Sequence, residues 1–377
     1  MRAANVRGEE QVLIRDEHRY CAHPHMAVLA SGTWLLAATC GPRRTVTMHP
    51  PQDPEFVNIL IRSNDEGRSW SPPCVVPAYG WTGMECAGLT ALPDGSVLLN
   101  QWRFRWYPYT APPDPLLEPL SNGPAALLQG LVGSREIEPD GPALASAPET
   151  LMPWVRGGGE AVTHRSEDDG RTWRSSAHIG TGAYAGGYGM RGAVVLPDGV
   201  ILLPLSDAPF YERIFLVRSP DGGRSWGAPQ PVAAAAGRTF EEPAPLLLED
   251  GTILVLLREN VSRTLYQIRS EDGGESWSPP APTGIEAYPA HLLSLPDGRI
   301  AAVVGCRRPP YGIAIYVSAD QGRSFGLDSP LCVRTGLPSK DLGYPTAALR
   351  DDGSLFVAYY YRDAAGVTGV HATIVAI

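Results

Sequence analysis

The chain has 377 residues, 44% of them hydrophobic and 19% charged, and its formal net charge is −9 at pH 7. This acidic balance argues against nucleic acid as a partner, because backbone phosphates are bound by clustered basic side chains. No apolar run is long enough to span a membrane, and residues 1–20 lack the apolar core of a signal peptide. We therefore expect a cytoplasmic protein with no membrane partner, or a secreted one if a signal has been removed.

The first recurring element is a β-hairpin, in which an apolar run, a turn ending in glycine and a second apolar run follow one another. Paired β-rich runs around an Asp-Gly turn are a strong short-range signal of a hairpin. Six copies occur, with their turn glycines at Gly32, Gly95, Gly199, Gly251, Gly298 and Gly353. The apolar runs are continuous rather than alternating, which is typical of inner strands buried on both faces.

A second element, which we call the Asp box, alternates with these hairpins. Its form is Ser-x-Asp-x-Gly-x-(Ser/Thr)-aromatic, and it predicts a turn in which the Asp side chain bonds nearby amides while the glycine takes a positive φ. Five copies occur, at residues 63–70, 166–173, 219–226, 270–277 and 318–325. Two of them contain Gly-x-Ser-x-Gly, but the strand–turn–helix context of a serine hydrolase is missing, so we interpret them as turns.

Together these elements predict an all-β fold, a single six-bladed β-propeller over residues 1–377 with four antiparallel strands in each blade. After Gly353 the chain has room for only two further strands. The fourth strand of blade six should therefore come from the amino terminus, at Gln11–Arg15, and close the ring. The spacing between Gly95 and Gly199 is about twice the usual one, so residues 104–159 in blade two are predicted to be an insertion that acts as a lid or a homo-oligomer contact.

Strand direction separates the two ends of the predicted propeller. Hairpin turns and structural Asp boxes fall at one end, and the opposite end, which we call the mouth, receives the residues that precede and follow each hairpin. Polar and aromatic side chains gather at the mouth, and the candidates are His23, Glu85, Arg191, Glu242, Arg258, Arg307, Arg308 and Tyr344. All but one of the 31 basic residues are arginine, whose planar fork suits carboxylates. The mouth is therefore predicted to bind a carbohydrate.

Asp boxes on a six-bladed propeller resemble the sialidase (neuraminidase) superfamily, over nearly the whole chain except the insertion. In that family blade four has a Glu followed by Pro or a small residue, then an Asp-Gly hairpin, then an Arg. Residues Glu242-Pro243 through Arg258 have this form. Blade six of the family has a nucleophilic Tyr before its Asp-Gly, a place that Tyr344 occupies, and Gly187–Met190 resembles the approach to the hairpin of blade three.

The resemblance implies an exo-acting glycoside hydrolase that removes a terminal sialic acid or a related acidic sugar. Tyr344 would be the nucleophile and Glu242 the base that accepts its proton, since a neutral phenol avoids the repulsion between a carboxylate nucleophile and an anionic sugar. Arg258 and one of Arg307 or Arg308 would fill two places of the family's arginine triad, which binds the carboxylate of the sugar.

Two positions differ from the family pattern. The first triad arginine of the family lies in Arg-Ile-Pro, where this chain has Ala22-His23-Pro24. Arg191, Arg43 or Arg44 would then substitute for it, or the sugar is a related acidic or a neutral one. The family's acid/base Asp lies in the loop before the first Asp box, where Asp53 is the candidate.

Two other functions remain open. A polysaccharide lyase on the same scaffold would use His23 or Tyr344 as the base that removes a proton beside a uronate carboxyl, while arginines stabilise the resulting charge. A non-catalytic propeller that binds a sugar or a protein would need no such base.

The cysteines and histidines lack the spacing of a metal site, and no nucleotide-binding loop occurs, so no cofactor is expected. The cysteines are expected to be free thiols, because they are scattered and a cytoplasmic compartment is reducing. They are Cys21, Cys40, Cys74, Cys86, Cys306 and Cys332.

Overall fold

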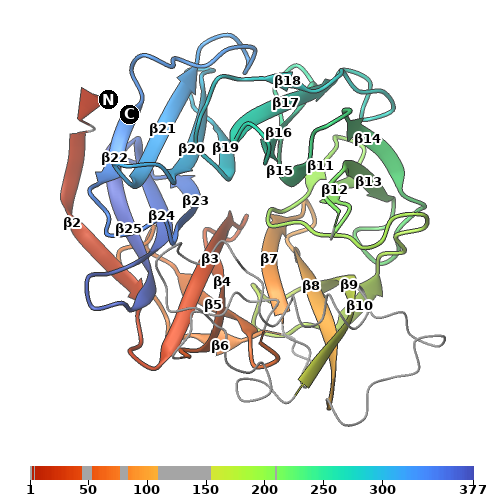
Figure 1. The fold of residues 1–377 in the computed structure, drawn as a ribbon, viewed down its shortest axis with the longest axis horizontal. Coiled ribbons are helices and arrows are strands. Elements are labelled where there is room, and N and C mark those ends of the chain that lie inside the picture. The colour runs from red at the N-terminus through yellow and green to blue at the C-terminus, as the bar shows by residue number, and fades with distance from the viewer. Residues whose placement is uncertain (1, 4, 45–52, 77–83, 109–153, 209) are drawn as a thin grey trace.

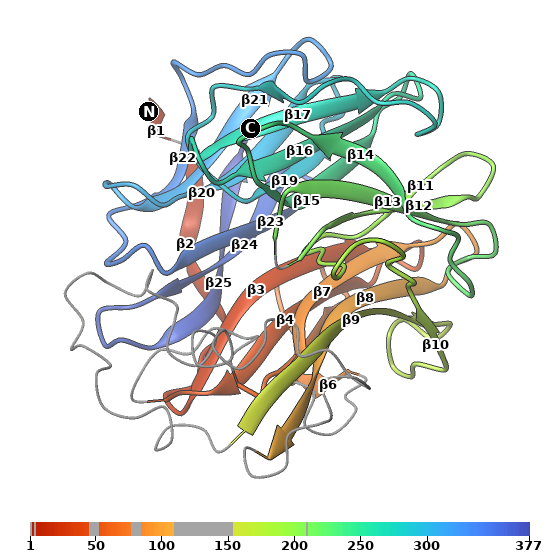
Figure 2. The ribbon, with the colours of Figure 1, turned by 45° about the vertical axis from the view of Figure 1, so that its right-hand side comes forward.

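The computed structural model describes residues 2–3, 5–44, 53–76, 84–108, 154–208 and 210–377. These residues form six β-sheets arranged as blades around a central axis (Figure 1), and no helix occurs among them. Figure 2 shows the twist of the blades as they fan around that axis. Within the described ranges, no helix is long and apolar enough to cross a membrane. The predicted six-bladed all-β propeller is confirmed.

Each blade is an antiparallel sheet whose first strand stands nearest the axis (Figure 1). Blade one contains β3 (Arg19–Val28), β4 (Trp34–Pro42), β5 (Val57–Ser63) and β6 (Cys74–Val75). Blade two contains β7 (Met84–Ala91), β8 (Val97–Pro108), β9 (Trp154–Ser166) and β10 (Ser175–His178). Blade three contains β11 (Val194–Val195), β12 (Ile201–Ser206), β13 (Arg213–Ser219) and β14 (Gln230–Ala234).

The remaining blades repeat this order. Blade four contains β15 (Phe240–Leu247), β16 (Ile253–Glu259), β17 (Thr264–Ser270) and β18 (Ala281–Pro282). Blade five contains β19 (Ala290–Ser294), β20 (Ile300–Cys306), β21 (Gly312–Ser318) and β22 (Leu331–Thr335). Blade six contains β23 (Leu342–Leu349), β24 (Ser354–Arg362), β25 (Thr368–Ala376) and the amino-terminal β2 (Asn5–Ile14).

The amino-terminal strand closes the ring, as predicted. β2 pairs antiparallel with β25 and so supplies the fourth strand of blade six, which removes a free sheet edge. The predicted strand Gln11–Arg15 lies largely within β2, which begins several residues earlier. A short strand, β1 (Arg2–Ala3), continues beyond it and pairs parallel with β22 of blade five. The amino-terminal segment therefore links blades five and six, because it forms main-chain hydrogen bonds with both.

The second strand of each blade is buried on both faces, which explains its continuous apolar sequence. In β4, Leu35, Leu36 and Ala37 have no exposed surface, and every residue of β12 is buried. Burial of one leucine side chain contributes about 1.5–3 kcal/mol to folding, so these strands hold neighbouring blades together. The blades pack on one another through these strands rather than around a single central core.

The Asp boxes are turns whose side chains bond the local main chain. In the first box, the Asp65 carboxylate accepts from the Ser69 amide (2.8 Å) and the Ser69 hydroxyl (2.5 Å), while the Ser63 hydroxyl accepts from the Gly67 amide (2.8 Å). Gly67 has a φ of 81°, which a glycine adopts without steric cost. The other four boxes repeat the bond from the Ser or Thr hydroxyl to the Asp.

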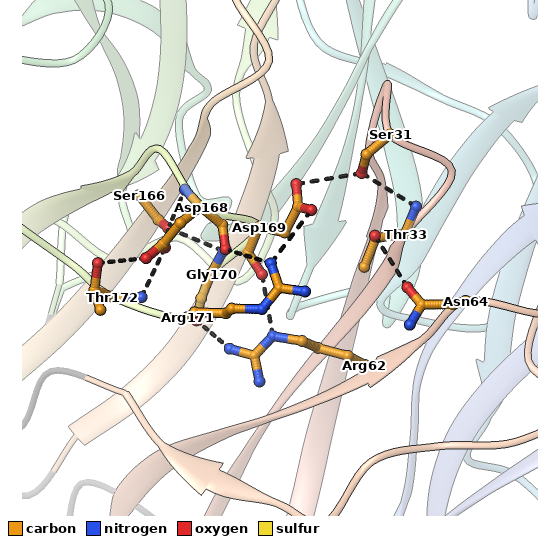
Figure 3. A network of polar contacts seen from close by, with 10 residues as sticks. All are labelled: Ser31, Thr33, Arg62, Asn64, Ser166, Asp168, Asp169, Gly170, Arg171 and Thr172. Carbon is orange, nitrogen blue, oxygen red and sulfur yellow. Dashed lines mark hydrogen bonds and ion pairs between the residues drawn. The ribbon is translucent and has the colours of Figure 1, made fainter.

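An arginine that directly precedes four of the boxes bridges to the box of the next blade. Figure 3 shows Arg62 of blade one reaching blade two, where its Nε donates to the Asp169 carbonyl at 3.0 Å and a second nitrogen donates to the Gly170 carbonyl. The same contact recurs from Arg165, Arg218 and Arg269 to the following blade. We call these four side chains the bridging arginines.

Strands β8 and β9 extend into both ends of the predicted insertion 104–159, and residues 109–153 within it lie outside the described residues, so its role stays a prediction. The expectation that all cysteines are free thiols is wrong for one pair, because Cys21 and Cys40 form a disulfide. They lie directly opposite each other on β3 and β4, with 4.3 Å between their Cα atoms. Cys74, Cys306 and Cys332 are free.

Candidate active site

Four of the inner strands contain the same irregularity near the mouth. Their pairing with the second strand skips a residue, at Ala22/His25 in β3, Glu85/Gly88 in β7, Glu241/Ala244 in β15 and Gly343/Thr346 in β23. A β-bulge of this kind bends the strand and re-aims one side chain. The equivalent positions in blades one, four and six are His23, Glu242 and Tyr344.

These three bulge residues share an unusual main-chain conformation. Their φ angles are 55° for His23, 54° for Glu242 and 43° for Tyr344, a region that bulky side chains rarely adopt. Each is followed by proline, which has no amide hydrogen that the bulge would leave unpaired. Such conformations cost about 1–3 kcal/mol each and cluster at functional sites. Strained main chain therefore occurs at all three of these residues, which the sequence singled out on other grounds.

The phenol of Tyr344 and the carboxylate of Glu242 meet at the mouth, although 102 residues separate them. Tyr344 Oη donates to Glu242 Oε1, and Arg258 Nη1 lies 3.3 Å from both carboxylate oxygens. Tyr188 Oη donates to the same Oε1 at 3.5 Å. Only 2% of Glu242 and 3% of Tyr344 is exposed, so the pair is almost fully desolvated.

The surroundings keep the phenol of Tyr344 protonated. Burial raises its pKa well above the usual 10.0, the Glu242 carboxylate raises it further, and Arg307 and Arg258 oppose both effects. Desolvation disfavours a phenolate, and a nearby carboxylate repels it. The resting state is therefore a neutral phenol that donates its proton toward an acceptor already in hydrogen-bond contact.

The arginines at the mouth differ in how far they are engaged by protein carboxylates. Arg258 forms ion pairs with Glu241 (3.0 Å) and Glu242 (3.3 Å), and its guanidinium stacks over the Tyr288 ring at 4.6 Å. Arg307 donates from Nε to the Leu342 carbonyl at 3.0 Å, and its guanidinium lies over the Tyr344 ring at 5.3 Å. No carboxylate among the described residues forms an ion pair with Arg307.

Arg308 is separate from this cluster. Its side chain is 52% exposed and forms an ion pair with Glu286. Of the two candidates for one triad place, the structure therefore brings Arg307, and not Arg308, to the Glu242–Tyr344 pair. Burial lowers the pKa of the Arg307 guanidinium and the neighbouring tyrosines raise it, with a net rise above the usual 12.5, so the side chain is a permanent cation.

His23 also belongs to the cluster. Its ring centroid lies 4.3 Å from that of Tyr344 and 5.2 Å from that of Tyr360, and only 1% of the residue is exposed. An imidazole thus packs on the phenol, at the place where the family pattern has an arginine.

A further group of buried polar residues surrounds Asp341. Tyr20 Oη donates to Asp341 Oδ1 at 3.0 Å, and Thr368 Oγ1 donates to Asp341 Oδ2 at 3.3 Å. Burial raises the pKa of Asp341 above its usual 3.8. The Tyr360 ring joins this group to Tyr344, with 6.0 Å between their centroids. Asp341 and Tyr360 were not among the candidates predicted from the sequence, and the adjacent tyrosines 359–361 at a predicted strand end were the available signal.

Three other candidates are also buried. Arg191 is 3% exposed, donates from Nε to the Ala290 carbonyl at 2.9 Å, and lines a cavity of about 380 Å³ along the axis. Glu85 is 1% exposed at the bulge of β7. Asp53 has no exposed surface, and its carboxylate accepts from Arg44 Nε at 2.8 Å and from the Glu55 amide at 2.9 Å. No contact joins Asp53 to Tyr344 or Glu242, and its assignment as acid/base stays a prediction.

Arg43 and Arg44, the possible substitutes for the first triad arginine, lie beyond the end of β4. Arg44 is engaged by Asp53 and Glu55, and Arg43 is exposed. Across the described part of the chain, no group of three or more His, Cys, Asp or Glu side chains is arranged to hold a metal ion.

Comparison with known proteins agrees with this architecture. The model of the BNR repeat-like domain family matches residues 149–357, which is more than half of the chain. No curated protein matches the chain by sequence. A protein of unknown function from Dyadobacter fermentans superposes with a TM-score of 0.77 at 23% identity, and the match covers 98% of each chain.

Structures of named enzymes also superpose. The NanB sialidase of Streptococcus pneumoniae gives a TM-score of 0.70 at 12% identity, covering 98% of this chain and 71% of that one. The intramolecular trans-sialidase of Ruminococcus gnavus gives 0.66 at 15%, covering 95% and 94%. The α-L-arabinanase of Penicillium chrysogenum gives 0.62 at 13%, covering 100% and 99%. The solved structures share the β-propeller fold of this chain. The chain therefore belongs to the BNR repeat-like domain family.

Proposed function

We propose that this protein is an exo-acting glycoside hydrolase that removes a terminal acidic sugar with Tyr344 as nucleophile and Glu242 as its base. The observation that carries the proposal is the hydrogen bond from the buried Tyr344 phenol to the Glu242 carboxylate, formed between two strained bulges on different blades. A phenol paired with a desolvated carboxylate can lose its proton as it attacks.

The reaction would proceed in two displacements. Tyr344 Oη forms a bond to the anomeric carbon while the bond from that carbon to the leaving oxygen breaks, and the phenolic proton passes to Glu242. A general acid protonates the leaving oxygen, for which Asp53 is the candidate from the sequence. Water then attacks the anomeric carbon and gives a proton to the general acid, which was left deprotonated by the first displacement, while the bond to Tyr344 breaks and Glu242 returns its proton to the phenolate. Each step is balanced without a cofactor.

The arginines at the mouth support an acidic substrate. Arg307 is a cation that forms no ion pair with a described carboxylate, and it lies against the nucleophile. Arg258 already shares its charge with Glu241 and Glu242, so it orients the base and has less capacity for a second anion. The carboxylate of the sugar would therefore bind mainly to Arg307. This single arginine would take the place of the arginine triad. The similar structures include both sialidases and an arabinanase, so the choice of an acidic sugar rests on Arg307 and not on the fold.

A polysaccharide lyase is the second candidate, because His23 packs on Tyr344 inside the same cluster. The base would remove the proton beside a uronate carboxyl, the electron pair would form a carbon–carbon double bond, and the bond to the leaving oxygen would break. A stabilised uronate carboxyl could again rest on Arg307.

The two candidates are separated by their products. The wild-type protein would be incubated with aryl glycosides of sialic acid and of uronic acids, and with uronate polymers under ultraviolet detection of an unsaturated product. Tyr344→Phe should abolish aglycone release. Tyr361→Phe is the matched control, because it removes a phenol from the same blade. The phenol of Tyr361, on β24, donates to Glu10 at 2.9 Å and not to Glu242. An unsaturated product would favour the lyase, and release of aglycone that survives Tyr344→Phe would exclude the proposed nucleophile.

A further inference from the structure

A second polar cavity lies at the mouth between blades one and six. Its volume is about 500 Å³, and its wall includes Arg19, Arg43, Arg44 and Arg362 together with Tyr20 and Thr368. The arginines come from the start of β3, the segment after β4 and the end of β24. Four guanidinium groups in one cavity are unusual in a chain whose net charge is −9.

Two of these guanidinium groups converge on one point. A methyl carbon placed on Gly366 would lie 3.2 Å from Arg43 Nη2 and 3.4 Å from Arg362 Nη2. Gly366 has a φ of 73° and occupies the turn between β24 and β25, so the absence of a side chain leaves this space open. Two like charges so close together repel each other unless an anion lies between or beside them.

The protein does not supply that anion from its described carboxylates. Arg43 donates only to the main-chain carbonyls of Glu17 (3.3 Å) and Ala365 (3.4 Å), and neither Arg43 nor Arg362 forms an ion pair with a described carboxylate. The nearby acidic side chains are occupied, since Arg15 pairs with Asp363 at 2.9 Å and with Glu17 at 3.7 Å.

The other two arginines of the cavity are neutralised by the protein. Arg44 forms 2.8 Å ion pairs with Asp53 and Glu55, and Arg19 lies 3.7 Å from Asp16. Arg43 and Arg362 are therefore the two arginines of this cavity whose guanidinium groups can bind a ligand oxyanion.

The cavity shares a wall with the candidate active site. Tyr20 and Thr368 line the cavity and both bond Asp341, and the Tyr360 ring connects this group to Tyr344. In an exo-acting enzyme the cleaved sugar is terminal, so any further part of the ligand lies on the leaving-group side. The cavity is therefore placed to receive a neighbouring sugar of the same chain.

We propose that Arg43 and Arg362 form a binding site for a carboxylate or sulfate group on the leaving-group side of the substrate. The substrate is then an acidic oligosaccharide with at least two anionic groups, one held at Arg307 and one at the Arg43–Arg362 pair. The place of this site in the reaction rests on the proposed function, whereas its affinity for an oxyanion does not.

Calorimetric titration tests the site without requiring activity. The probes are inorganic sulfate and digalacturonate, which separate a sulfate from a carboxylate ligand, and both are titrated at low ionic strength. Arg43→Gln and Arg362→Gln should each weaken binding of the preferred probe by about tenfold or more, because a charge-assisted hydrogen bond is lost. Arg171→Gln is the matched control at the opposite end of the propeller, where an exposed arginine is removed for the same change in net charge.

A pair of glycine substitutions sharpens the test. Gly366→Ala places a methyl group between the two guanidinium groups and should weaken binding as the arginine substitutions do. Gly336→Ala is its control, since Gly336 has a similar φ of 71° and no atom within 4 Å of the added carbon. Lost binding in Gly366→Ala with unchanged binding in Gly336→Ala identifies the space above Gly366 rather than a general effect of strain.

The outcomes for this site and for the proposed function are distinct. No binding of either probe to the wild-type protein, or equal weakening by Arg171→Gln, would overturn the site. Binding that depends on Arg43 and Arg362 in a protein that cleaves no glycoside would retain the site and reject the hydrolase. If cleavage occurs, KM for substrates with an acidic leaving group should rise in Arg362→Gln, while kcat/KM for neutral aryl glycosides of the same sugar stays unchanged.

Discussion

The two ends of the propeller are built in opposite ways. At the Asp-box end, side chains satisfy the main chain of their own turn. Positive φ angles occur there at the box glycine and at the residue before it, and the same pattern recurs from blade to blade. At the mouth, His23, Glu242 and Tyr344 take positive φ angles themselves, charges are buried, and each blade carries a different residue. Repetition marks structure, whereas strained and non-repeated residues mark the site, because stability alone would not retain them.

The largest expected effect is a loss of activity on changing a residue at the mouth. Glu242→Gln removes the base, so turnover should fall by about 10²–10⁴-fold, measured as the initial rate of aglycone release. The melting temperature should not fall, because Arg258 keeps its partner Glu241 and one desolvated charge is removed. A lower melting temperature together with unchanged specific activity would mean that Glu242 has a structural role and is not the base.

The converse change at the Asp-box end should affect stability alone. Asp65→Ala removes the acceptor of the Ser69 amide and hydroxyl, and we expect a loss of about 2 kcal/mol in the free energy of unfolding in urea. The Ser69 hydroxyl lowers the pKa of Asp65 to about 2, so this contribution is present above pH 3.8 and is lost as the pH falls toward 2. Specific activity at neutral pH should equal that of the wild type.

Two buried histidines, His25 and His291, should make the fold sensitive to acid. Burial and the charge of Arg191 lower the pKa of His291 to about 3 and that of His25 well below 6.5. Each Nδ1 accepts a main-chain amide, from Leu89 for His25 and from Ala347 for His291, and protonation breaks this bond.

Because the unfolded chain takes up these protons below about pH 6.5 and the folded chain does not, stability present above that pH should fall on acidification. Unfolding in urea at pH 7 and pH 5 measures the difference. His25→Asn, whose Oδ1 can accept the Leu89 amide, should reduce the dependence on pH. An unchanged slope in this variant would mean that other groups cause the acid sensitivity.

The smallest effect concerns the contact between blades. Arg62→Gln removes the bonds from blade one to the Asp box of blade two (Figure 3), and we expect a loss of about 1 kcal/mol in the free energy of unfolding. Hydrogen exchange should increase around residues 168–170. Arg171→Gln, an exposed arginine at the same end, is expected to leave both quantities within error.

The architecture could be predicted because its signals are local. A Gly-turn hairpin and an Asp box each form from a few neighbouring residues. Six copies of the hairpin leave a ring as the arrangement that buries every inner strand. The closing strand followed from counting, since blade six lacks a fourth strand and Gln11–Arg15 is the remaining apolar run. The pairing of Glu242 with Tyr344 followed once the family pattern placed both at the mouth.

The choice among neighbouring residues was decided by tertiary structure. Arg307 and Arg308 are adjacent in sequence, yet only Arg307 reaches Tyr344, because the two side chains leave the strand end in different directions. Asp53 is buried under Arg44, and Asp341 joins Tyr20 and Thr368 only where blades one and six meet. Sequence alone therefore determined the number and order of the blades, which depend on local turns. Ring closure and the bulges decided which distant side chains share one desolvated site, because both act through contacts that span about a hundred residues or more.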